Sequence, residues 1–155
     1  MSEQSWHNYF MGIADAVSKK SHCLSHQFGA IAVRDRIILS TGYNGPPRKY
    51  THCVGSECPR HRVGYQSGQG LEVCPAVHAE LNALIQASRI GACLVASSLY
   101  ITSPIPCREC AKAIVNAGVI EVVYSNDTRY HDIGLTGWDI LVKCGINLTY
   151  LAPGK

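Results

Sequence analysis

The 155-residue chain has little charge, because Asp, Glu, Lys and Arg together make up 16% of it. The 14 Lys and Arg residues exceed the 11 Asp and Glu residues by 14 − 11 = 3, and they are scattered along the chain. Such a weak excess predicts neither a nucleic-acid-binding arm nor a basic membrane helix, although it allows a single small anionic ligand. With 46% apolar residues the chain is not disordered, and its length predicts one domain, residues 1–155.

Long apolar runs are also absent, since none approaches the roughly 18 residues of a membrane span. The first residues, MSEQSWHNYFMG, lack the charged start and apolar stretch of a secretory signal. We therefore expect a cytoplasmic protein, in the host cytoplasm if a phage encodes it, with no membrane partner. Eight cysteines in a reducing compartment indicate metal ligation or catalysis rather than disulfides.

The apolar pattern contains no internal repeat and predicts helices that alternate with strands. Helices are expected at about 6–17, 77–90, 107–117 and 135–142, and strands at 28–33, 37–43, 98–102, 119–125 and 146–151. A turn at Arg34-Asp35-Arg36 joins the first two strands as a hairpin. A hairpin followed by alternating helices and strands predicts an α/β fold with one five-stranded mixed sheet flanked by helices.

A Cys-rich loop at about 45–75 interrupts this pattern. It is far longer than the usual connection of about 4–6 residues. Its residues include the potential metal ligands Cys53, Cys58, His61 and Cys74. A bound metal is a natural way to hold so long a loop within one domain.

The strongest local signal is His78-Ala79-Glu80 combined with Pro106-Cys107-Arg108-Glu109-Cys110. Both segments fall where a helix is expected to begin, and a helix N-terminus stabilises the thiolate form that binds metal. His78, Cys107 and Cys110 supply three ligands, as in a catalytic zinc site, where water takes the fourth position. Zinc lowers the pKa of such a water, and Glu80 is placed to act as the proton shuttle beside it.

Each half of this pattern has a less specific interpretation. A lone C-x-x-C is often redox-active or part of a structural zinc site, and a lone H-x-E is very common. Together, in this order and with Pro106 before the first cysteine, they match the signature of zinc-dependent nucleobase deaminases.

Further motifs extend the match: Gly42-Tyr43-Asn44-Gly45, Cys74 through Ala83, Pro106 through Lys112, and Tyr130-His131-Asp132. In these residues the chain, over roughly 14–151, resembles the deoxycytidylate (dCMP) deaminase family. The resemblance implies a cytidine-deaminase-like three-layer α-β-α sandwich. It also implies hydrolysis of dCMP to dUMP and ammonia for thymidylate synthesis, by a hexamer that dCTP with Mg²⁺ activates and dTTP inhibits.

The resemblance also implies residue roles. Glu80 is the catalytic proton carrier, and the substrate is bound by Asn44, Ala79, Ser103 and Tyr130. Tyr43, Asn44 and Gly45 belong to the allosteric nucleotide site. The chain departs from the family at Thr102-Ser103-Pro104-Ile105-Pro106-Cys107, where Ile105 replaces a small polar residue and one residue is added. The turn before Cys107 is expected to offer a backbone carbonyl to the base.

The remaining cysteines divide into two groups. By resemblance, Cys23, Cys53, Cys58 and Cys74 form a second, structural zinc site, with His61 or His26 as substitutes for Cys58. Otherwise these cysteines are free thiols or small buried apolar residues. Cys93 and Cys144 lie in apolar stretches and are expected in the core. The other histidines, His7, His22 and His52, are expected to be surface or local hydrogen-bonding residues. Phosphate-binding candidates are Arg48, Lys49, Arg108, Lys112, Arg129 and His131.

Two other function classes stay open. The same chemistry serves free cytidine, tRNA adenosine or single-stranded nucleic acid, but a polynucleotide enzyme needs a basic groove with stacking aromatics. The net charge of +3, with two Trp and two Phe, argues against that, so no nucleic-acid partner is expected. A zinc-containing nucleotide sensor without catalysis has no need for Glu80.

Overall fold

The computed structural model describes residues 2–66, 69–128 and 134–152, which contain the predicted order of helices and strands. The elements are α1 (Glu3–Ser18), β1 (Gly29–Arg34), β2 (Ile37–Tyr43), α2 (Pro59–Val63), α3 (Ala79–Ile90), β3 (Ser98–Ile101), α4 (Arg108–Asn116), β4 (Glu121–Tyr124), α5 (Gly137–Lys143) and β5 (Asn147–Tyr150). The short helix α2 and the 3₁₀ turns Gly55–Glu57 and Leu71–Val73 lie in the Cys-rich loop, where no helix was predicted. None of the helices in these ranges is long and apolar enough to cross a membrane.

The five strands form one mixed sheet in the order β2-β1-β3-β4-β5. Strand β1 runs antiparallel to both of its neighbours, whereas β3, β4 and β5 are parallel to one another. The predicted hairpin turn joins β1 to β2, and Asp35 and Arg36 have φ values of 51° and 63°. Two consecutive positive φ angles are those of a type I′ turn, which matches the twist of the flanking strands.

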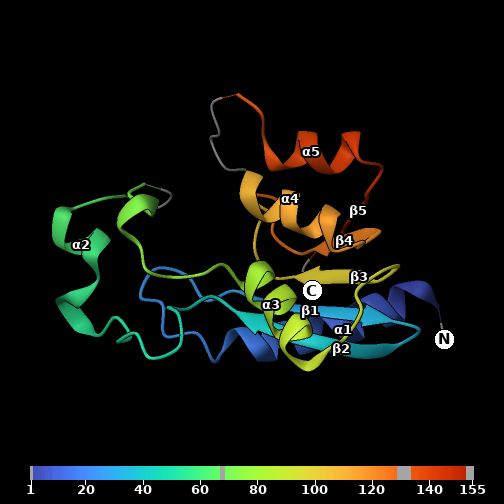
Figure 1. Ribbon diagram of the computed structural model, residues 1–155, viewed down its shortest axis with the longest axis horizontal. Coiled ribbons are helices and arrows are strands. Elements are labelled where there is room, and N and C mark those ends of the chain that lie inside the picture. The colour runs from blue at the N-terminus through green and yellow to red at the C-terminus, as the bar shows by residue number, and fades with distance from the viewer. Residues whose placement is uncertain (1, 67–68, 129–133, 153–155) are drawn as a thin grey trace.

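Helices cover both faces of the sheet (Figure 1), and alternating residues of β1 divide the core into one part on each face. Ala30 and Ala32 pack on the face covered by α3, α4 and α5, and Ile31 and Val33 pack on the face covered by α1. Successive side chains of a strand point to opposite faces, so a fully apolar strand is covered on both sides. The predicted three-layer sandwich is therefore confirmed.

Helix α1 covers its face with Phe10, Met11 and Ala14, all buried, in agreement with the apolar spacing of the sequence. His7 on the same helix is also buried, and its Nδ1 lies 3.0 Å from the hydroxyl of Tyr100 on β3. His7 is therefore a hydrogen-bonding residue rather than a surface one, but its partner is 93 residues away in the sequence and not local as expected.

The expectation that Cys93 and Cys144 are core residues was also wrong, since both are exposed. Cys144 caps the C-terminus of α5. Cys93 follows Gly91, which ends α3 in the left-handed conformation. Both cysteines lie just past the point where a helix leaves the core, so apolar neighbours in the sequence do not bury them.

Gly42 allows α3 to lie directly against β2. A Cβ atom on Gly42 would be 2.3 Å from the carbonyl oxygen of Ala79 and from the amide nitrogen of Ala83. Asn82 fixes the same contact by donating from Nδ2 to the carbonyl oxygen of Tyr43 at 2.8 Å. The strand end and the first turn of α3 are thereby held in one position.

We expect Gly42→Ala to lower the melting temperature, because overpacking typically costs about 1–3 kcal/mol and about 1 kcal/mol shifts Tm by roughly 2–4 °C at this size. Gly12→Ala is the matched control, since a Cβ at Gly12 meets nothing within 4 Å and alanine favours the helix. Differential scanning calorimetry of both variants measures the effect. Equal Tm values for the two would contradict the close approach at Gly42.

Candidate active site

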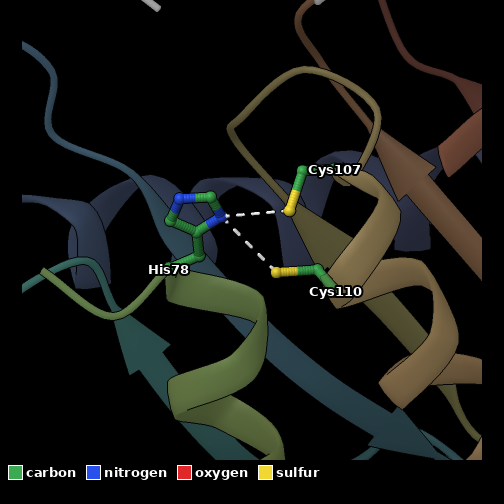
Figure 2. A group of neighbouring side chains, drawn as sticks. All are labelled: His78, Cys107 and Cys110. Atoms are coloured by element: carbon green, nitrogen blue, oxygen red, sulfur yellow. Dashed lines mark hydrogen bonds between the residues drawn. The ribbon is translucent and has the colours of Figure 1, made fainter. Parts of the chain in front are cut away.

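The three predicted catalytic zinc ligands converge at the starts of two helices (Figure 2). His78 is the N-cap of α3, Cys107 is the N-cap of α4, and Cys110 lies in the first turn of α4. The Nδ1 atom of His78 is 3.4 Å from the Sγ of Cys107 and 3.5 Å from the Sγ of Cys110. Among the described residues, this is the one group of three or more His, Cys, Asp or Glu ligand atoms that all lie within 4.8 Å of one another.

The close approach of the two sulfurs and the imidazole perturbs the pKa values of both thiols. A hydrogen bond between the thiols, reinforced by His78, lowers the pKa of Cys107 well below its ordinary value. The same contact, together with burial, raises the pKa of Cys110. The two sulfurs therefore differ in their affinity for a proton, although they lie beside the same imidazole. Two thiolates and an imidazole are a donor set of catalytic zinc sites.

Glu80 lies in the first turn of α3, two residues after His78, and only 4% of it is exposed. Burial raises the pKa of its carboxyl, while the nearby His78 opposes this shift. A carboxyl whose pKa is raised by its surroundings binds and releases a proton closer to neutral pH. The position and the environment of Glu80 therefore suit a proton carrier.

The departure from the family motif is accommodated in the loop between β3 and α4. Ile105 is 8% exposed and packs into the core shared with α3 and α4. Its side chain therefore does not take the place of the small polar side chain that the family motif has at this position. Ser103 is 2% exposed, and its hydroxyl donates to Oε1 of Glu80 at 3.1 Å. This side-chain contact was not predicted from the sequence, in which the unusual Ser-Pro-Ile-Pro segment was its one possible signal.

Residues 4–126 match the family described as the cytidine and deoxycytidylate deaminase zinc-binding region. The chain belongs to this family. The matched residues include the His78-Ala79-Glu80 segment and both cysteines of the Cys107–Cys110 pair.

Individual deaminases of this family match nearly the whole chain. The deoxycytidylate deaminase of Mycobacterium phage D29 is 39% identical over 133 residues, which cover 83% of this chain and 100% of the phage protein. The crystal structure of dCMP deaminase from cyanophage S-TIM5, in complex with dCMP and dUMP, superposes with a TM-score of 0.78 at 30% identity, covering 97% of this chain and 99% of the other.

A longer relative has the same name. The deoxycytidylate deaminase of Saccharomyces cerevisiae is 36% identical over 146 residues, or 93% of this chain. These residues are 44% of the yeast protein, so the chain spans less than half the length of that deaminase.

The residues that the family resemblance assigns to nucleotide binding lie around the end of β2 and the start of α3. Asn44 is buried, and its side chain accepts from the amide of Phe28 at 2.8 Å and donates to the carbonyl of His26 at 2.9 Å. Gly45 pairs with Val77 through two backbone hydrogen bonds, which place Ala79 beside the same strand end. Tyr43 is 39% exposed. The described contacts thus give Asn44 a structural function, and its contact with substrate stays a prediction.

The predicted phosphate-binding residues are only partly described. Tyr130, Arg129 and His131 lie outside the described residues. Arg48 and Lys49 are exposed. Arg108 and Lys112 are exposed on α4 and both pair with Glu109, at 3.3 Å and 2.9 Å.

The four cysteines of the predicted second zinc site line one small cavity of about 30 Å³. They come from distant parts of the chain: Cys23 precedes β1, Cys53 and Cys58 flank the first 3₁₀ turn, and Cys74 precedes α3. Burial and the neighbouring Cys58 raise the pKa of Cys53, with smaller effects from Cys74 and Cys23. The four cysteines lie around the same cavity. Their sulfurs are not all within 4.8 Å of one another, whereas the ligand atoms of His78, Cys107 and Cys110 are.

Two histidines were overlooked as neighbours of these cysteines. His22 and His52 line the same cavity, and their rings lie 4.8 Å apart. Both are exposed, as predicted. The proposed substitutes lie elsewhere: Nε2 of His61 is 2.9 Å from the hydroxyl of Ser25, and His26 stacks on Phe28.

We expect Cys110→Ser to remove one zinc ion per chain relative to the unmodified protein, because a serine hydroxyl does not replace a thiolate ligand at this site. Cys144→Ser is the matched control, since Cys144 is exposed at the end of α5 and should leave the zinc content unchanged. Elemental analysis of the purified proteins gives the zinc content. Retention of full zinc by Cys110→Ser would exclude Cys110 as a ligand.

Proposed function

We propose that this chain catalyses the hydrolytic deamination of dCMP to dUMP and ammonia, and so supplies dUMP for thymidylate synthesis. The observation that supports this most directly is the buried carboxyl of Glu80 beside the convergent His78, Cys107 and Cys110. The family match and the likeness to a phage enzyme crystallised with dCMP and dUMP point to the same substrate.

The reaction consumes one water molecule. The water oxygen bonds to C4 of the cytosine, and the bond between C4 and the amino nitrogen breaks. One proton of the water ends on N3 of the uracil, and the other leaves with the amino group as ammonia. A single group that carries out two successive transfers, each time accepting a proton and then donating it, is sufficient for the proton balance.

The metal site would be held by Nδ1 of His78 and the sulfurs of Cys107 and Cys110. Zinc bound there would lower the pKa of a coordinated water, so that hydroxide is available at neutral pH. The two helix N-termini point positive dipoles at this position and stabilise the thiolates. The sulfurs therefore stay ionised inside a partly buried site.

Glu80 is the proton carrier in this proposal. It takes the first proton from the water and gives it to N3, and it then takes the second proton from the hydroxyl now bonded to C4 and gives it to the departing amino group. Burial raises the pKa of the carboxyl. The difference between this pKa and the pKa values of the groups with which Glu80 exchanges protons is therefore smaller. The same burial keeps bulk water from competing for that proton.

The substrate is proposed to lie against the end of β2 and the β3–α4 loop. Asn44 would hold the sugar, Ala79 and Ser103 would face the base, and Tyr130 would close over the nucleotide. Among the cations, the exposed Arg48 is suited to the phosphate, because a guanidinium binds phosphate through two parallel hydrogen bonds.

The regulation proposed here is that of the family resemblance. A hexamer would bind dCTP with Mg²⁺ as activator and dTTP as inhibitor, at a site built partly from Tyr43, Asn44 and Gly45. The exposed ring of Tyr43 and the exposed Ile37 and Ile38 on the same edge strand are compatible with a contact between subunits. The protein would act in the cytoplasm.

A second, structural zinc is proposed at Cys23, Cys53, Cys58 and Cys74. Four protein ligands close a zinc site to water and make it structural. A zinc ion there would join the segment before β1, the Cys-rich loop and the segment before α3. In support, the four cysteines line one cavity although they are far apart in the sequence.

We expect purified protein to release ammonia from dCMP and Glu80→Gln to lower kcat by about 10²–10⁴-fold, the usual contribution of a general acid–base residue. Zinc content should not change in this variant, because Glu80 is not a ligand. Glu72→Gln, at an exposed carboxyl in the second 3₁₀ turn, is the control and should retain activity.

Parallel assays with dCTP and Mg²⁺, and with dTTP, test the regulation: dCTP should raise the rate and dTTP should lower it. Equal rates with dCTP and with dTTP would support the deaminase activity and contradict the proposed regulation. Turnover of cytidine but not of dCMP would reject the proposed substrate. A protein that binds dCMP with full affinity and releases no ammonia would be a sensor.

Unmodified protein should contain two zinc ions per chain, and Cys53→Ser should contain close to one, because three ligands hold a structural zinc less tightly than four. Cys93→Ser, an exposed cysteine outside the cavity, should still contain two. Elemental analysis decides between them. Two zinc ions in Cys53→Ser would remove Cys53 from the site.

A further inference from the structure

The hydroxyl of Ser103 donates a hydrogen bond to the carboxylate of Glu80. The distance from Oγ to Oε1 is 3.1 Å, and both residues are almost fully buried, at 2% and 4% exposed. The two residues lie 23 positions apart, one after β3 and the other in the first turn of α3. The contact therefore joins the β3–α4 loop to the helix that contains His78.

The backbone around Ser103 is held firmly on both sides. Thr102 donates its amide to the carbonyl of Gly29 at 3.0 Å, and its hydroxyl accepts from the amide of Gly29 at 2.9 Å. Pro104 follows directly and restricts the backbone of Ser103 to extended conformations.

The far end of the same loop is packed against α5. Pro106 is fully buried, and a Cβ atom on Gly137 would lie 1.8 Å from the Pro106 carbonyl oxygen. The loop therefore has no room to shift toward α5, and the Ser103 hydroxyl reaches Glu80 from a fixed base. The contact therefore differs from a hydrogen bond made by a side chain on a flexible surface loop, because the backbone that positions the Ser103 hydroxyl is itself held in place.

A fixed donor matters for a carboxylate because the last torsion of a glutamate side chain is broad and has no strong preference of its own. A proton carrier acts efficiently only when its oxygen lies within hydrogen-bond reach of the reacting atoms. A misplacement of about 1 Å reduces the rate by as much as about 10²-fold.

We propose that Ser103 is a positioning residue, whose hydroxyl holds Oε1 of Glu80 so that Oε2 is the oxygen that exchanges protons with substrate and water. This inference rests on the proposed deaminase function and deepens it. It assigns the side chain of Ser103 a function in addition to the backbone contact with the base that the family resemblance implies for this turn. It also gives a purpose to the segment in which this chain departs from the family.

Steady-state kinetics with dCMP test the inference. Ser103→Ala should lower kcat by about 10–100-fold, as expected for a displaced catalytic group, while KM changes less than the rate does. Ser103→Thr retains the hydroxyl and should recover most of the lost rate. Ser97→Ala is the matched control, because Ser97 is equally buried, donates to the carbonyl of Leu94, and lies at the opposite end of β3. Its kcat should equal that of the unmodified enzyme.

A double-mutant cycle separates positioning from a merely structural effect. If Ser103 acts through Glu80, Ser103→Ala should cause no further loss of rate in a Glu80→Gln background. An equal fold-loss in both backgrounds would overturn the proposal, as would a Ser103→Ala enzyme with a kcat within twofold of the unmodified enzyme. A rise in KM at constant kcat would likewise overturn it and assign Ser103 to substrate binding.

The same experiment keeps the two proposals apart. The unmodified enzyme is assayed with both dCMP and cytidine, and the cycle is run with the substrate that it deaminates. Inactivity of the unmodified enzyme on dCMP rejects the proposed substrate. The ratio of rates between the serine and alanine forms, on the active substrate, decides the function of Ser103.

Discussion

Two helix N-termini, those of α3 and α4, meet at one point, and the chemistry of the protein depends on how closely they approach. Each helix start contributes a cap residue, His78 or Cys107, whose side-chain atoms lie 3.4 Å apart. The approach is possible because small residues line the contacts behind it: Gly42 lets α3 lie on β2, and Gly137 lets α5 lie on the loop before α4. The metal ligands are thus placed by packing elsewhere in the core.

The same packing buries Glu80 and makes its carboxyl sensitive to its few neighbours. A carboxyl in water is surrounded by donors, whereas Glu80 has the helix N-terminus, His78 and the Ser103 hydroxyl. In a low-dielectric site each of these interactions has more effect than it would at the surface. The surroundings of the Glu80 carboxyl are therefore set by the β3–α4 loop as well as by the residues of the signature motif.

The sequence predicted the order of the elements and the group of His78, Cys107 and Cys110, because both follow from local spacing. Two cysteines three positions apart at a helix start face the same way in any fold. The contact between Ser103 and Glu80 was not predicted, since it depends on the path of a loop that departs from the family motif. Cys93 and Cys144 were misplaced because apolar neighbours in sequence do not show where a helix leaves the core. Helix α2, with five residues, is too short for an apolar period to reveal it.

The parallel arrangement of β3, β4 and β5 brings the carboxyl ends of all three strands to one edge of the sheet. An added residue inside a helix would rotate every later side chain of that helix by about 100°. An added residue in the loop after β3 does not rotate the side chains of α4, because that helix begins only after its N-cap, Cys107. The fold can therefore change the length and sequence of the segment that contacts the proton carrier while both sulfurs keep their direction. The hydrogen bond to Glu80 can therefore be altered at this edge without moving His78, Cys107 or Cys110.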